Sequence, residues 1–308
     1  IFLIFSRFLL ELSLLLLTFS FLFHLFKKKE FLFIKNNFSL FFSIFFIFLI
    51  FSYFFSQFKH ETYTILFYFR FYLYILALSY FFVKEKNLIS YFFNSIIFVI
   101  IILFVDSSIQ FFYGKNILGY ENSELHRITS FFDDEQILGS FTTKMFVFLL
   151  FAKIIIDQTK TKTHFFLNIS LIACPILIFL SGERASLLMF LIMIFYYLIF
   201  LYREKRIRFF YFFSFFSIVL VIVFLFSSKT YYDRYVTQTI SSIFDKNYSQ
   251  NHDLMPNNMK GNYNFYFLSA QHQNFMITSL NIFKQNKILG SGPKSFRYIC
   301  ADESVRVS

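Results

Sequence analysis

The sequence predicts an all-α membrane protein, a polytopic bundle of about eight transmembrane helices with a large extracytoplasmic loop. Two observations lead to this fold class. Of the 308 residues, 57% are hydrophobic and only 15% are charged, whereas soluble domains carry about 25% charged residues. Long apolar stretches also recur along the chain, with basic clusters between them. A water-soluble fold could not bury this much apolar surface in one core.

The apolar stretches define the spans in order. Each one reaches or approaches the roughly 20 residues that a helix needs to cross the hydrocarbon layer. The predicted spans lie near 6–26, 38–58, 62–83, 88–112, 137–156, 165–181, 185–202 and 209–227. We therefore expect a transmembrane helical domain over residues 1–227 and an extracytoplasmic segment over residues 228–308.

The basic residues between the spans predict the orientation, because cytoplasmic loops collect Lys and Arg. One alternate set of loops holds most of them: Lys27, Lys28, Lys29, Lys35, Lys84, Lys86, Lys153, Lys160, Lys162, Arg203, Lys205, Arg206 and Arg208. The opposite loops hold only Lys59, Lys115, Arg127 and Arg184. The second set should face outward, together with the segment after the last span. The same loop bias accounts for the net charge of +11, so no nucleic-acid partner is predicted.

Two of the predicted outer segments are long and polar, namely 113–136 and the tail from Ser228 onward. An amphipathic helical run occupies 274–286 of this tail. It is followed by a turn that Gly290, Gly292 and Pro293 impose. Signatures of nucleotide-binding and zinc enzymes are absent from the sequence. We therefore expect no cofactor and no metal.

Three arginines are the candidate binding residues on the predicted outer face. Arg184 lies in the very short turn between two spans, Arg127 lies in the first long outer loop, and Arg234 follows the last span. An arginine at the membrane surface can hold a phosphate through bidentate hydrogen bonds. The alternative is an ordinary membrane anchor for Arg184, whose stem would lie along apolar surface, and a solvated loop charge for Arg127 and Arg234.

Charged residues also interrupt the spans. Arg70 lies about two turns from the outer end of its span, and Lys144 has a similar place in span 137–156. Intramembrane charges are costly and suggest a functional site, although long side chains near a helix end can reach the interface instead. Arg7 and Glu11 are four residues apart and can pair on one helix face. We interpret that pair as structural.

The histidines on the predicted outer face are candidate general bases, because a histidine can exchange protons near neutral pH. They are His60, His126, His252 and His272. Any one of them alone is better explained as a loop residue, and His272, just before the amphipathic run, is the best placed. Cys174 falls inside a span and should behave as an apolar residue. Cys300 falls outside, where disulfides can form.

Three stretches together resemble the O-antigen ligase and O-antigen polymerase superfamily of bacterial membrane glycan transferases. They are RITSFFDDEQILGSF at 127–141, LSGERASLLMFLI at 180–192 and FMITSLNIFKQNKILGSGPKSFR at 275–297. The first resembles the arginine-led segment before a helix of that family. The second resembles its short outer turn, and the third its amphipathic helix and glycine turn in the large periplasmic loop. The order and common outward placement of the stretches are more specific than any one of them.

The resemblance implies a location and a reaction. The protein would lie in the bacterial inner membrane with its large loop in the periplasm. It would transfer a glycan from a polyprenyl diphosphate carrier to an acceptor sugar hydroxyl. In a ligase the acceptor is the lipid A-core, as in lipopolysaccharide biosynthesis, and in a polymerase it is another carrier-linked chain. The resemblance leaves these two open. Arg184, Arg127 and Arg234 would hold the diphosphate, and no cofactor is implied.

The sequence departs from the family pattern at its end. The catalytic histidine of the family follows the glycine turn, and this chain stops at Ser308 before such a stretch. His272 precedes the turn, so we assign it only a candidate contact. Because the chain begins with Ile1 inside an apolar run, we expect a fragment. A transporter or flippase for lipid-linked glycans is the alternative function, and a purely structural membrane component is a third.

Overall fold

The computed structural model describes residues 7–30, 33–56, 63–121, 127–133, 135–159, 164–203, 229–244, 270–288 and 290–300. Within these ranges the structure is helical and has no strand, apart from one isolated bridge between Lys115 and Glu121. The all-α fold class is therefore confirmed. Two compact units can be distinguished: one comprises 1–10 and 86–237, and the other comprises 11–85 and 238–308.

The described residues of the predicted spans from 6–26 to 185–202 are almost all helical. Four helices are long and apolar enough to cross a membrane: Phe8–Lys28, Asn37–Phe55, Ile65–Lys84 and Asn87–Tyr113. Two shorter apolar helices, Phe165–Leu180 and Arg184–Tyr197, follow. The predicted span 209–227 lies outside the described residues. The protein is thus a membrane protein, while the count of eight spans and the division at residue 227 stay predictions.

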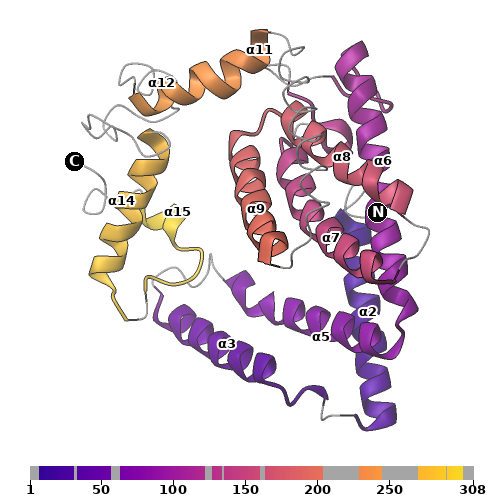
Figure 1. The fold of residues 1–308 in the computed structure, drawn as a ribbon. Coiled ribbons are helices and arrows are strands. Elements are labelled where there is room, and N and C mark those ends of the chain that lie inside the picture. Colours follow the sequence, from indigo (N-terminus) through magenta and orange to yellow (C-terminus); the bar gives the residue numbers. More distant parts are fainter. Residues whose placement is uncertain are drawn as a thin grey trace. The chain divides into compact units, whose positions relative to one another are not determined.

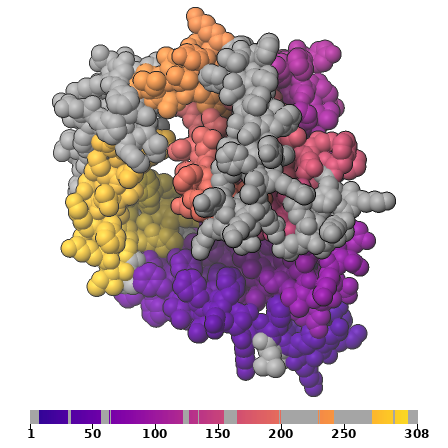
Figure 2. Space-filling model, in the orientation of Figure 1, coloured from indigo at the N-terminus to yellow at the C-terminus, as the bar shows by residue number. Residues whose placement is uncertain are grey.

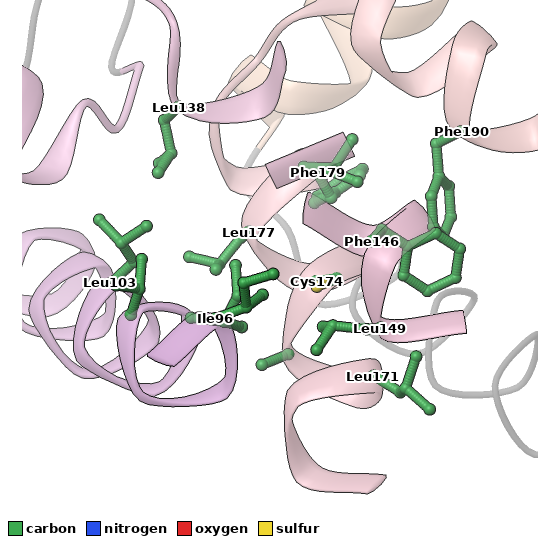
Figure 3. Packing of buried hydrophobic residues seen from close by; sticks show 14 of the residues in the cluster. Ile96, Leu103, Leu138, Phe146, Leu149, Leu171, Cys174, Leu177, Phe179 and Phe190 are labelled. Atoms are coloured by element: carbon green, nitrogen blue, oxygen red, sulfur yellow. The ribbon is translucent and has the colours of Figure 1, made fainter. Parts of the chain in front are cut away.

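The helices of the unit that contains 86–237 pack around one apolar core. They are α6 (Asn87–Tyr113), α7 (Leu138–Thr159), α8 (His164–Leu180) and α9 (Arg184–Arg203). Helix α8 packs against both α6 and α7, and α9 packs against α7 (Figure 1). Leu103 of α6, Leu149 of α7 and Leu177 of α8 are completely buried between them (Figure 3). Phe146 and Phe190 extend this core toward α9, with ring centroids 4.9 Å apart.

The other unit contains α2 (Arg7–Lys28), α3 (Asn37–Phe55) and α5 (Phe69–Lys84). A 3-10 helix, η2 (Tyr63–Tyr68), precedes α5. Its small core consists of Phe21, Leu25 and four buried α5 residues, Tyr72, Leu76, Ala77 and Tyr80. Phenylalanines of α3 are instead widely exposed, as Phe41 (71%) and Phe55 (69%) illustrate. Exposed phenylalanines on a span are expected to face lipid.

The C-terminal part of this unit contains α14 (Ala270–Gln285) and the short α15 (Phe296–Ile299). Side chains of α14 form part of its surface (yellow in Figure 2). The turn between the two helices has the predicted character, because Gly290 and Gly292 adopt positive φ angles of 67° and 101°. Ser56 donates a hydrogen bond from its hydroxyl to the Ser291 carbonyl at 3.1 Å. The turn therefore packs against the C-terminal end of α3.

Candidate functional site

The short turn between α8 and α9 is the centre of the candidate site. Helix α8 ends at Leu180, and Gly182 then adopts a φ of +66° that reverses the chain. Its N–H donates to the Phe179 carbonyl at 3.1 Å, which closes the last turn of α8. Glycine favours this left-handed conformation because it has no Cβ. The SGER stretch therefore forms a compact helix-to-helix reversal.

Two of the predicted arginines meet on one atom of this turn. Arg127 donates from its Nη2 to the Gly182 carbonyl oxygen at 3.3 Å, and Arg234 donates from its Nε to the same oxygen at 3.0 Å. A Cβ on Gly182 would lie 3.2 Å from Cγ of Arg127 and 3.5 Å from Nε of Arg234. The glycine thus leaves room for both side chains. Cations at the C-terminal end of α8 are also favoured by its dipole.

The third arginine begins the next helix. Arg184 is the first residue of α9, two positions after Gly182, and is half-buried. Burial lowers the pKa of the Arg127 guanidinium, the Glu183 carboxylate raises it, and the positive charge of Arg184 lowers it. An arginine stays protonated under such influences. The structure therefore brings Arg127, Arg184 and Arg234 together, whereas their role toward a diphosphate stays a prediction.

Glu183 holds the turn against the start of α7. Its Oε1 accepts a hydrogen bond from the Gly139 N–H at 2.7 Å, and its Oε2 accepts one from the Ser140 N–H at 3.0 Å. The hydroxyl of Ser186 donates to Oε2 at 2.6 Å. The carboxylate therefore satisfies N–H groups at the start of α7 and also binds a hydroxyl in the first turn of α9. A Cβ on Gly139 would collide with Ser181, so the two helix ends can approach this closely only with glycine there.

Two tyrosines support the turn from the segment that contains Arg234. They belong to α11 (Lys229–Tyr232) and to the π-helical stretch Asp233–Thr237. Tyr235 donates its hydroxyl to the Phe179 carbonyl at 2.8 Å, and Tyr231 donates to the Leu180 carbonyl at 3.3 Å. Both rings also stack on the Phe179 ring. Burial raises the pKa of Tyr231 to about 12, so this hydroxyl remains a donor at neutral pH.

A buried polar cluster lies near the C-terminal end of α6 and binds the loop that carries Arg127. The side chains of Asp106 and Gln110 are completely buried and lie one helical turn apart. Asp106 accepts hydrogen bonds from the Ser130 hydroxyl at 2.5 Å and from the Ile117 N–H at 2.9 Å. Gln110 accepts from the N–H groups of Thr129 at 3.2 Å and Ser130 at 2.7 Å. Charged and polar groups are buried here because each has partners.

Ser130 adopts an unusual backbone conformation within this cluster, with a φ of +54°. A residue other than glycine rarely occupies the left-handed region, at a cost of about 1–3 kcal/mol. Asn116 adds to the restraint by donating from its side chain to the Ser130 carbonyl at 2.9 Å. Hydrogen bonds at the Ser130 N–H and at the Ser130 carbonyl therefore hold this conformation. The path of residues 127–130 is thereby determined.

The other predicted residues are not part of this turn. Arg70 forms a two-pronged ion pair with Glu11, with nitrogen-to-oxygen distances of 3.0 Å, and is half-exposed. The partner predicted for Glu11 was Arg7, whose side chain lies outside the described residues. Lys144 is exposed on α7. His272 is exposed in α14. His272 and the turn residues Gly290, Gly292 and Pro293 belong to the other unit. His60, His126 and His252 lie outside the described residues.

The sequence did not point to Asp106, Gln110, Glu183 or the two tyrosines. Besides Arg70 and Lys144, α6 carries a further ionisable residue inside a span, Asp106, which is completely buried. An acidic residue inside an otherwise apolar run was the available signal. Glu183 carried a weaker signal, since an acidic residue just before a helix is a typical N-cap. Among the described residues, no three His, Cys, Asp or Glu side chains form a group that could hold a metal ion.

One comparison with known families found a match. The model of the O-antigen ligase family matches residues 169–305. This match, which covers less than half of the chain, supports the resemblance to the O-antigen ligase and polymerase superfamily. The match covers the Arg184 turn and the glycine turn, whereas the stretch at 127–141 lies before it. Searches among curated proteins and among solved structures found no match. The match suggests a membrane enzyme of the glycosyltransferase type, with lipid-linked glycan donors and glycan acceptors in general.

Proposed function

We propose that the protein transfers an oligosaccharide or polysaccharide from a polyprenyl diphosphate carrier to an acceptor sugar hydroxyl on the periplasmic face. The single observation that supports this most is the meeting of three arginines at the Gly182 turn within a chain that the model of the O-antigen ligase family matches. The acceptor would be the lipid A-core in ligation or a carrier-linked chain in polymerisation. Polysaccharide biosynthesis at the cell surface is the process that either reaction serves.

The arginines would act on the diphosphate, which is both the recognition element of the donor and the leaving group. Each guanidinium carries five N–H donors, so a hydrogen bond to the Gly182 carbonyl does not prevent contact with a phosphate. As the sugar-to-phosphate bond breaks, negative charge grows on the diphosphate. Fixed positive groups stabilise that charge more in the transition state than in the ground state. No metal or nucleotide is required, because the diphosphate is already a good leaving group.

The surroundings of the arginines favour a held geometry over mobile loop charges. Arg127 and Arg234 are half-buried and share one carbonyl oxygen, and Arg184 is anchored in the first turn of α9. Preorganised donors stabilise developing charge without reorganisation. The structural alternative is that Arg127 and Arg234 only cap α8. Under that alternative, Arg184 should be dispensable.

The test is complementation of a strain that lacks the gene, using Arg184→Ala in the full reading frame. We expect surface glycan to fall about a hundredfold or more, with carrier-linked precursor accumulating on the periplasmic side, where added glycosidase digests it in spheroplasts. Lys229→Ala is the control, because this exposed lysine of the same unit takes no part in the turn. Precursor that resists digestion until the cells are lysed would favour the flippase. Normal glycan in Arg184→Ala would remove this residue from the mechanism.

A further inference from the structure

We infer that Asp106 and Gln110 are positioning residues for Arg127, and that they set the geometry of the arginine cluster from within α6. The expected effect on diphosphate affinity rests on the proposed function. The positioning of Arg127 by the cluster does not depend on it. The inference joins a buried polar cluster inside a membrane-spanning helix to an arginine three residues before Ser130, which the cluster binds. The link between them is the backbone of residues 127–130.

The cluster contains an ionisable side chain inside a membrane span. Placing such a side chain there costs free energy and commonly marks a functional site. Asp106 has no exposed surface, and its two oxygens accept from three groups: the Ser130 hydroxyl, the Ile117 N–H and, at 3.4 Å, the Asn116 amide. All three donors belong to the loop after α6. The cluster therefore serves the loop and does not tie α6 to another span.

Several hydrogen bonds hold the loop backbone at Ser130. Gln110 lies one turn after Asp106 on the same helix face and accepts from two successive N–H groups, Thr129 and Ser130. Asp106 accepts a hydrogen bond from the Ser130 hydroxyl, and the Asn116 side chain donates one to the Ser130 carbonyl. Ser130 is thus bound through its N–H, side chain and carbonyl. This explains how a positive φ is maintained at a residue other than glycine.

Arg127 lies close to Ser130 along the chain, only three residues before it. The intervening Ile128 is buried, and its N–H donates to the Leu180 carbonyl at 3.4 Å. Arg127 then reaches the Gly182 carbonyl, two residues after Leu180. Residues 127–130 therefore run from the α6 cluster to the α8–α9 turn with contacts at both ends. If the hydrogen bonds to α6 are lost, the backbone at residue 127 is no longer held in place, and the Arg127 side chain loses its defined position.

Two measurements on the full-length protein in lipid nanodiscs test this. The first is tryptic cleavage after Arg127 under native conditions, followed by mass spectrometry. The second is affinity for undecaprenyl diphosphate, used as a probe without glycan. Asp106→Ala should accelerate the cleavage about tenfold or more and weaken the affinity about tenfold, since hydrogen bonds to a buried charge are lost. Gln110→Met, which removes the acceptor but keeps the size, should have the same two effects.

Ser107→Ala is the matched control. Ser107 is the next residue of α6, is equally buried, and its hydroxyl makes no hydrogen bond in the structure. Its substitution should change neither measurement. Asp106→Asn guards against a failure to fold, because it keeps the size and an acceptor for the Ile117 N–H. We expect it to fall between wild type and Asp106→Ala in both measurements.

The outcomes separate the inference from the proposed function. In an Arg127→Ala background, Asp106→Ala should weaken undecaprenyl diphosphate binding no further, because its effect acts through Arg127. Additive losses, or unchanged cleavage in folded Asp106→Ala and Gln110→Met, would overturn the inference. If cleavage accelerates while neither Arg127→Ala nor Asp106→Ala changes the affinity, the positioning is supported and the proposed diphosphate site is what fails.

Discussion

The two units of the chain use their polar residues in opposite ways. In the unit that contains 86–237, buried side chains such as Asp106 and Gln110 bond to the backbone of loops. In the unit that contains 11–85, charged side chains pair with one another at partly exposed positions: Arg70 with Glu11, and Lys84 with Glu30. The first arrangement fixes where a loop runs. The second joins α5 to α2 and to Glu30, which lies just after α2.

The two units also differ in how far their apolar side chains are buried. Helices α6 to α9 share a continuous core in which Leu103, Leu149 and Leu177 have no exposed surface (Figure 3). Helix α3 exposes most of its phenylalanines. In a bilayer, lipid is as apolar as leucine and gives little force for helix association. The unit with the buried polar loops is therefore the one built to hold a geometry, and this is the unit where the arginines meet.

The largest effect on stability should come from Glu183→Ala. The substitution leaves the N–H groups of Gly139 and Ser140 without their acceptor and removes the partner of the Ser186 hydroxyl. Loss of such a cap costs about 2 kcal/mol. Thermal unfolding in detergent should detect it, and surface glycan should fall as the Gly182 turn moves. Glu183→Gln keeps one acceptor oxygen and should lose less. Equal stability of Glu183→Ala and wild type would show that the turn does not depend on this carboxylate.

A smaller effect is expected from the Arg70–Glu11 pair, which would sharpen the contrast between the units. The pair has good two-pronged geometry, but both side chains are more than 40% exposed, at 43% and 41%. Exposed pairs contribute about 0.2–1 kcal/mol. A double-mutant cycle with Glu11→Gln and Arg70→Gln, measured by unfolding in detergent, should give a coupling energy within that range. Glycan transfer should be retained in both variants. Its loss in Arg70→Gln would restore Arg70 as a functional residue.

The smallest effect concerns Glu30 and depends on pH. The hydrogen bonds from Lys84 and Tyr80 lower the pKa of Glu30 below its ordinary value of 4.5. A carboxyl with a depressed pKa stabilises the fold above its unfolded pKa, and this contribution disappears as the pH falls through the folded pKa. Wild type should therefore unfold at a slightly higher temperature than Glu30→Gln at pH 7. The two should converge below pH ~4. A difference that persists at low pH would contradict an ionic contribution.

The sequence predicted the helices better than the site. Apolar length identified α2, α3, α6 and α8 with ends within a few residues, because lipid requires long apolar helices wherever they occur. It did not predict that α5 is preceded by a 3-10 helix at Tyr63–Tyr68. In the site, the outward loop charges pointed to Arg127, Arg184 and Arg234. Nothing in their spacing along the chain indicated that two of them would share the Gly182 carbonyl.

By itself, the sequence determined the membrane class, the resemblance to the O-antigen ligase family and the choice of candidate arginines, because hydropathy, loop charge and short motifs are local properties of the chain. Only the tertiary structure decided which groups act together. Asp106, Ser130 and Gly182 lie far apart in sequence, and their relation depends on α6, α7 and α8 packing into one core. A buried donor or acceptor must find its partner wherever the fold places one. For this reason the hydrogen bonds that hold the arginine cluster became visible only in three dimensions.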